Sequence, residues 1–119
     1  PSVSRTEAQD EFNDILKWLQ ERLESDCVDR SIKIKDTLMF YLYLMSRQFF
    51  HDCNKRTATL FVNLLFNHYD LNCFLWFPTL EELAVFLDKL QFCYENIEFK
   101  TDFEFVDYLY STWLVDFSV

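Results

Sequence analysis

The stretch that decides the fold lies near the middle of the chain and reads RQFFHDCNKR over residues 47–56. One apolar run ends in this stretch, and a second starts directly after it. A helix that begins here has unpaired backbone N–H groups at its N-terminus, and these attract anions. Lys55 and Arg56 can neutralise negative charge, and Asp52 can hold a divalent cation. The stretch therefore predicts two helices that meet at a site for a polyphosphate and its metal ion.

Apolar residues at helical spacing extend outward from this stretch in both directions. Residues 36–49 are apolar on nearly all faces, which predicts a central helix with Asp36 as its cap. A second buried helix is predicted from near Asn54 to about Tyr69, with His68 and both Leu60 and Leu64 on its buried faces. The two central helices would thus hold the polar stretch on rigid elements.

Three further helices are predicted nearer the ends of the chain. The first covers residues 6–25, and two capping boxes open the others, Thr79 with Glu82 and Thr101 with Glu104. In these two helices the residues predicted to point inward are Leu83, Phe86, Leu87 and Leu90, and then Phe105, Val106, Leu109 and Trp113. Residues 70–77 read as an aromatic loop or short extended piece. We therefore expect an all-α domain spanning residues 1–119.

The composition limits the kinds of site that this domain can build. A chain of 119 residues is large enough for one core, and half of its residues are hydrophobic. It contains no glycine, which argues against hairpin-rich β architecture and excludes the glycine-based phosphate loops. Its formal net charge of −9 argues against nucleic acid as a partner, because nucleic-acid affinity comes mainly from phosphate neutralisation. A phosphate site in this chain must be built in another way.

The four cysteines and the hydropathy indicate the compartment. Cys27, Cys53, Cys73 and Cys93 are widely spaced and match no zinc or redox pattern, so we expect four free thiols in a reducing cytoplasm. No window approaches the roughly 20 apolar residues of a membrane span. The polar, acidic start is not that of a signal peptide. We expect a cytoplasmic protein that does not bind membranes.

Residues 36–76 resemble the core of the Fic/Doc family. The family motif reads His-x-Phe-x-Asp/Glu-Gly/Ala-Asn-Gly/Lys-Arg between two buried helices, and residues 48–58 of this chain read QFFHDCNKRTA. The ending NKRTA is similar to that of the Doc-like branch. The resemblance implies a Fic-like helical bundle in which the two central helices flank an anion-binding loop. It also implies a short β-flap for target docking, at residues 31–35.

The resemblance also implies an activity and the residues that carry it. Fic proteins usually transfer AMP from ATP to a hydroxyl of a target protein (AMPylation), and Doc-type members transfer the terminal phosphate instead. By position, Asp52 would hold Mg²⁺, Asn54 would order the loop, and Lys55 and Arg56 would bind phosphate oxygens. Phe50 would be the buried anchor that fixes the loop. The implied cofactors are ATP, or another nucleotide, and Mg²⁺, and the implied partner is a target or regulatory protein.

Two positions depart from the family pattern. Cys53 replaces a small Gly or Ala and adds a side chain where backbone must approach phosphate closely. Gln48 occupies the position of the catalytic histidine, which takes the proton from the attacking hydroxyl. An amide cannot act as a general base, and losing such a base costs about 10²–10⁴ in rate. His51 titrates in the right range, but it lies three positions further on and should point elsewhere.

Three hypotheses therefore remain open from the sequence. The chain is a Fic-type transferase, a catalytically inactive Fic-like domain that binds nucleotide or a protein, or a helical interaction module without a ligand. The plain alternative for residues 52–56 is an ordinary turn in which Asp52 and Asn54 cap and Lys55 and Arg56 are solvated. Nucleotide binding separates the last hypothesis from the first two.

Overall fold

The computed structural model describes residues 5–47, 54–95 and 102–118, and it is mostly helical. In chain order the elements are α1 (Arg5–Glu24), α2 (Arg30–Arg47), α3 (Asn54–His68), β1 (Cys73–Leu75), α4 (Leu80–Glu95), α5 (Asp102–Thr112) and β2 (Leu114–Asp116). Each of the five predicted helices is present in these residues, although α2 begins earlier than predicted, and a small antiparallel sheet of β1 and β2 accompanies them.

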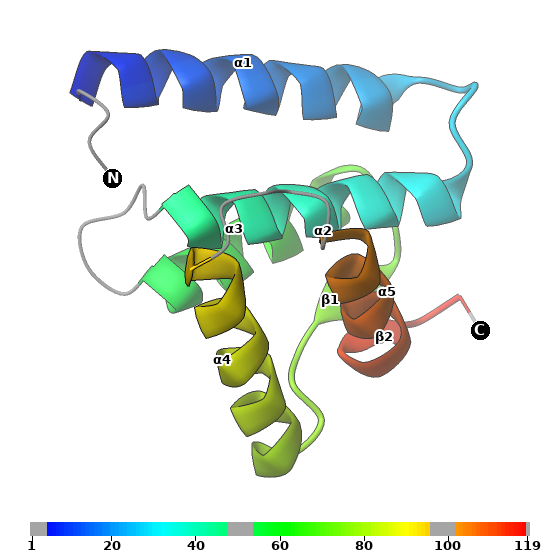
Figure 1. The fold of residues 1–119 in the computed structure, drawn as a ribbon. Helices are drawn as coiled ribbons and strands as arrows, with labels where there is room; N and C mark the ends of the chain where they lie inside the picture. Colours follow the sequence, from blue (N-terminus) through cyan, green and yellow to red (C-terminus); the bar gives the residue numbers. More distant parts are fainter. Residues whose placement is uncertain (1–4, 48–53, 96–101, 119) are drawn as a thin grey trace.

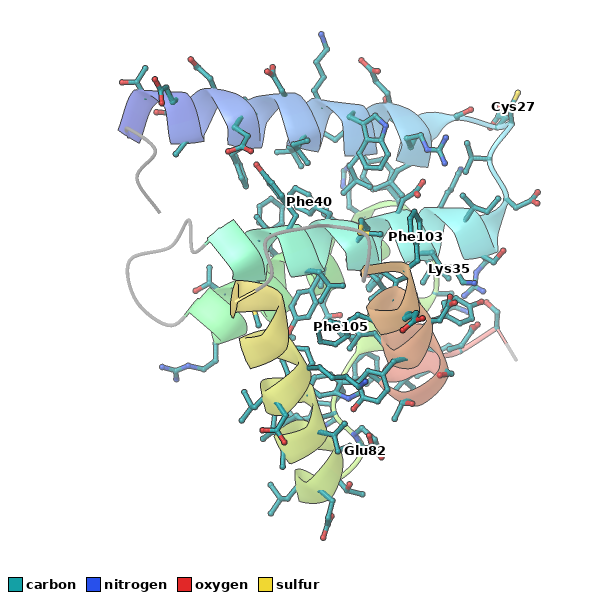
Figure 2. The ribbon with its side chains drawn as sticks, in the orientation of Figure 1. Cys27, Lys35, Phe40, Glu82, Phe103 and Phe105 are labelled. Atoms are coloured by element: carbon teal, nitrogen blue, oxygen red, sulfur yellow. The ribbon has the colours of Figure 1, made fainter. Side chains whose placement is uncertain are left out.

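Helix α2 lies at the centre of the fold, as its apolar sequence predicts. All six residues from Phe40 to Met45 are at most 5% exposed, so this part of the helix is buried on every side. Figure 1 shows α1 lying along one side of α2, with α4 and α5 on the opposite side. Phe40 lies between α1 and α2 (Figure 2), where its ring centroid is 6.1 Å from that of Phe12. Fully burying a side chain of this size contributes about 1.5–3 kcal/mol.

The predicted β-flap at residues 31–35 is wrong, because these residues form the first turns of α2. The N–H of Lys33 donates to the carbonyl of Asp29 at 2.9 Å, which closes the first helical turn. Ile34 is fully buried and Ile32 is 43% exposed. Ile34 therefore lies on the same buried face as Leu38, one turn before it. The alternation over five residues was too short to distinguish a strand from the amphipathic start of a helix.

Asp36 was predicted as the cap of this helix and lies inside it instead. Its carboxylate accepts a hydrogen bond from Nε of Arg22 at 2.9 Å, which joins α2 to α1. The helix therefore begins seven residues, about two turns, earlier than predicted.

Helix α3 begins at Asn54 and ends at His68, as predicted, but some of its faces differ from the prediction. Ala58, Val62 and Phe66 are fully buried, whereas Leu60 and Leu64 are 61% and 57% exposed. His68 is also exposed, so its predicted place in the core is wrong. The buried stripe follows residues four apart, and positions two residues away from it point to the opposite side of a helix.

Helix α3 ends in a left-handed residue, a position that is usually glycine, although this chain contains no glycine. The N–H of Leu71 donates to the carbonyl of Phe66 at 2.9 Å, and that of Asp70 donates to the carbonyl of Asn67 at 3.2 Å. This is the Schellman arrangement, whose left-handed residue is usually glycine. Asp70 takes that position with a φ of 54°, which Asp and Asn tolerate better than most residues.

The segment after α3 is extended, as expected, and it pairs with the end of the chain. Phe74 of β1 faces Val115 of β2 across the antiparallel register. The C-terminal segment therefore contributes a strand to this fold. Part of it stays outward, since Phe117 is 60% exposed and stacks on Phe74 with ring centroids 5.5 Å apart.

The predicted cap of α4 and most of the predicted faces of the last two helices are confirmed. The N–H of Glu82 donates to Oγ1 of Thr79 at 3.1 Å, which confirms the cap of α4. Phe86 is buried and Leu83 is half-buried, but Leu87 is 40% exposed, contrary to the prediction. The inward residues predicted for α5 are confirmed, and these are Phe105, Val106, Leu109 and Trp113. Phe105 lies between α4 and α5 (Figure 2); Thr101 and the Leu90 side chain lie outside the described parts.

Candidate functional site

Helix α3 begins where the sequence places the phosphate site. Asn54 and Lys55 are in its first turn, and Arg56 follows them with an exposed side chain. The first N–H groups of any helix have no partner within it, so this end of α3 carries partial positive charge. Gln48, Asp52 and Cys53 lie outside the residues that the structure describes, as do Phe50 and His51. The predicted roles of those five residues remain predictions.

A cavity of about 490 Å³ borders the first turns of α3. Arg56, Thr59, Leu60 and Asn63 line it from α3, and Leu83 lines it from α4. The rest of its wall is aromatic and consists of Tyr41, Trp76, Phe77, Phe86 and Trp113. We call this space the aromatic cavity. Its volume is typical of ligand sites, which are mostly apolar with a few placed polar groups.

Asn63 holds β1 against α3 and so positions one wall of the aromatic cavity. Its Oδ1 accepts a hydrogen bond from the N–H of Leu75 at 2.7 Å, and its Nδ2 donates to the Leu75 carbonyl at 3.2 Å. The side chain therefore acts as a partner for the strand edge. The next residue, Trp76, donates its backbone N–H to the carbonyl of Trp113 at 3.0 Å. A hydrogen-bonding residue in an apolar run was the signal for this role, but the sequence did not reveal its partner.

Tyr108 joins α5 to α4 behind the cavity. Its hydroxyl donates to Oε2 of Glu82 at 2.8 Å and accepts a hydrogen bond from Nε1 of Trp113 at 3.3 Å. The ammonium of Lys89 lies 5.2 Å from the centroid of the Tyr108 ring. Burial, together with the hydrogen bond to Glu82, raises the pKa of Tyr108, so the phenol stays protonated as a donor. Glu82 lies on α4 (Figure 2), and this network therefore sets the distance between α4 and α5.

At the opposite end of α3, Arg30 connects three segments. Its guanidinium donates to both carboxylate oxygens of Asp116, at 2.8 and 3.1 Å, and to the carbonyl of Leu71 at 3.0 Å. We call this group the Arg30 clasp. The hydrogen bonds from Arg30 hold the pKa of Asp116 below its ordinary value.

A second cavity, of about 690 Å³, lies beside the Arg30 clasp. Cys73 and Asn72 line it, and burial raises the pKa of the Cys73 thiol to about 11. Such a thiol is unreactive at neutral pH. The Asn72 side chain donates to Oγ of Ser118 at 3.2 Å. The polar groups of this region thus join the C-terminal segment to the fold, and we interpret the region as structural.

Metal and membrane sites can be assessed only in part. Within residues 5–47, 54–95 and 102–118, no group of three His, Cys, Asp or Glu side chains could hold a metal ion. None of the helices there is long and apolar enough to cross a membrane. Cys27 and Cys73 are free thiols, as expected. Cys53 and the side chain of Cys93 are not among the parts of the chain that the structure describes.

Comparison with protein-family models gives no match, and comparisons with curated proteins and with solved structures give none either. The resemblance to the Fic/Doc family therefore rests on the motif at residues 48–58 and its helical setting.

Proposed function

We propose that this chain is a Fic-type domain that binds ATP, or another nucleotide, together with Mg²⁺. The transfer of AMP or phosphate to a target-protein hydroxyl is impaired or lost in it. The observation that carries the proposal is the aromatic cavity beside the first turns of α3, with Arg56 in its wall.

The arrangement supports a ligand with an anionic end and an apolar end. Backbone N–H groups at the start of α3 and the Arg56 side chain can bind phosphate oxygens, and Lys55 is assigned the same role by its position in the motif. Arg56, Thr59 and Leu60 all line the aromatic cavity, and from Asn54 to Leu60 the helix axis advances only about 9 Å, so the cavity runs alongside the first two turns of α3. A nucleotide has this same division, with phosphates at one end and a flat, largely apolar base at the other.

The motif also supplies a ligand for the magnesium ion that accompanies nucleotides, because Asp52 comes two positions before Asn54 in the sequence. Mg²⁺ is commonly held by one or two carboxylates together with substrate phosphates, so a single Asp52 is sufficient. When bound, the ion offsets the charge of the phosphates. Arg56 contributes a further positive charge from the cavity wall.

The identity of residue 48 is the reason to propose impaired transfer. The Gln48 amide can position a hydroxyl by a hydrogen bond, but it cannot accept the proton that the hydroxyl loses. Nucleotide binding does not require that proton transfer. The chain therefore keeps nucleotide binding, while its catalysis is weak or absent.

The alternative is a catalytically inactive Fic-like module that binds nucleotide or acts through protein contacts. Leu60, Leu64 and Trp76 favour a protein contact, because each of these large apolar side chains is more than half exposed. Exposed apolar groups that lie together often mark an interaction surface.

Calorimetry with ATP and Mg²⁺ tests the proposal. We expect measurable binding that the double variant Lys55→Ala/Arg56→Ala abolishes or strongly weakens. Lys17→Ala is the matched control, because Lys17 is an exposed cation on α1. Absence of binding and of any thermal shift would refute the nucleotide site. If ATP binds, incubation with candidate targets, followed by mass spectrometry for mass gain, separates weak transfer from none.

A further inference from the structure

The aromatic cavity has polar and apolar parts in a fixed order. Arg56 stands at the end near the start of α3, where negative charge is favoured. Beyond it, the wall contains Thr59 and Asn63 and otherwise consists of Leu60, Leu83 and the five aromatic side chains named above. Charge complementarity therefore places the phosphates of a nucleotide at the Arg56 end and its base among the aromatic rings.

Several polar groups of this wall are already hydrogen-bonded within the protein. The Tyr41 hydroxyl and Oγ1 of Thr59 are 3.0 Å apart and form a hydrogen bond. Both ends of the Asn63 amide bind the backbone of Leu75, and Nε1 of Trp113 donates to Tyr108. Strong discrimination between similar ligands depends on buried polar groups that only the correct ligand can satisfy. Groups that are satisfied inside the fold make no such demand on a base.

Trp76 differs from the other aromatic residues of the wall. Its side chain is 56% exposed, whereas Tyr41 and Phe86 are each 1% exposed. Its ring stacks on Phe77, with centroids 5.0 Å apart and planes 19° apart. Its backbone is fixed by the bonds of Leu75 to Asn63 and of its own N–H to Trp113. The indole is thus a supported aromatic surface that can still be covered.

We infer that the aromatic cavity binds the base of a nucleotide by stacking on Trp76 and by shape, with little selection among the bases. The inference rests on the proposed function, and it specifies the ligand class as nucleoside triphosphates in general. Base–aromatic stacking tolerates any base, because every base presents a π-face. Trp76 is then a residue that determines affinity, while Lys55 and Arg56 hold the phosphates.

Calorimetry on the full chain with five ligands tests the inference. The ligands are ATP, GTP, CTP, UTP and inorganic tripolyphosphate, each with Mg²⁺. We expect the four nucleotides to agree within about threefold and to bind roughly tenfold more tightly than tripolyphosphate. Trp76→Ala should remove that tenfold advantage and leave tripolyphosphate binding unchanged, while Trp76→Phe should keep most of it. Trp18→Ala is the matched control, since Trp18 is a 42% exposed tryptophan on α1.

The outcomes separate this inference from the proposed function. A preference of about tenfold or more for one base would overturn the inference, because it requires hydrogen-bond recognition. Tripolyphosphate binding as tightly as the nucleotides would also overturn it, but the phosphate site would stand. The same holds if Trp76→Ala weakens all five ligands equally. Absence of binding by all five would refute the proposed function and the inference with it.

Discussion

The two ends of the antiparallel α2–α3 pair use their polar side chains in opposite ways. At one end, the Arg30 clasp joins α2 to the turn after α3 and to β2 through hydrogen bonds inside the protein. At the other end, Arg56 borders a cavity whose walls are apolar and partly exposed. Arg30 stabilises the fold, whereas Arg56 contributes positive charge to the wall of the proposed ligand site. Variants at the two ends should therefore differ in what they change.

The largest effect is expected from Gln48→His, in the motif that the proposed function assigns to catalysis. If only the base is missing, this change should raise transfer to a target hydroxyl by about 10²–10⁴, because it supplies the proton acceptor. Mass gain on the target, measured over time with ATP and Mg²⁺, gives the rate. Thermal unfolding should be nearly unchanged. Transfer that stays undetectable while ATP still binds would show that residue 48 is not the only defect, and Cys53→Gly would be the next change to make.

The next effect concerns thiol reactivity at the clasp end. Burial raises the pKa of Cys73 from an ordinary value of 9.0 to about 11, which lowers its thiolate fraction at pH 8 about 100-fold. Cys27 is exposed. Alkylation followed by peptide mapping should thus label Cys27 first and Cys73 only after unfolding in urea. Rapid labelling of native Cys73 would mean that the clasp end opens easily, and the contrast between the two ends would fail.

The parts of the fold that could be predicted from the sequence are those that depend on local patterns. The helices could be predicted because apolar spacing and caps are local, and Thr79 and residues 105–113 behave as their local pattern requires. Residues 31–35 could not, because their alternation fits a strand until Ile34 is seen to join the buried stripe of Leu38. The exposure of Leu60, Leu64 and His68 depends on which neighbours cover α3, and no local pattern contains that information.

The candidate site also has one part that could be predicted from the sequence and one part that could not. The start of α3 and the position of Arg56 followed from the motif at residues 48–58. The aromatic cavity did not, because Tyr41, Trp76, Phe86 and Trp113 come from four separate segments that only the tertiary fold brings together. The Arg30 clasp was missed for the same reason, since Arg30 and Asp116 are 86 positions apart.

At the clasp end, Arg30→Met should lower the free energy of unfolding by about 2–3 kcal/mol. The change removes charge-assisted hydrogen bonds and leaves Asp116 and the Leu71 carbonyl without this partner. Urea unfolding at pH 7 measures the loss. Lys33→Met is the matched control, because Lys33 lies one turn further along α2. ATP binding should be unaffected by either change, if the two ends are independent.

Acid provides a second measurement on the same pair. Arg30 lowers the folded-state pKa of Asp116 below its ordinary 3.8, so the stabilisation is present above that value. It is lost as the pH falls from 3.8 through the folded pKa. The difference between the wild-type chain and Arg30→Met should therefore shrink below about pH 4. A difference that stays constant down to pH 2 would mean that packing of the Arg30 side chain, and not its charge, is responsible.

The smallest effect is expected at Asp70, which closes α3 beside the clasp in a left-handed conformation with φ of 54°. Glycine has no Cβ to strain there, so Asp70→Gly should raise the free energy of unfolding by less than about 1 kcal/mol, because the greater freedom of unfolded glycine offsets part of the gain. Asp70→Ala removes the same carboxylate but keeps a Cβ, and it should lower stability by about 1 kcal/mol. Both variants lack the carboxylate, so the difference between their free energies of urea unfolding measures the effect of the left-handed backbone alone. Equal changes in both would mean that the carboxylate of Asp70, rather than its left-handed backbone, is what the end of α3 requires.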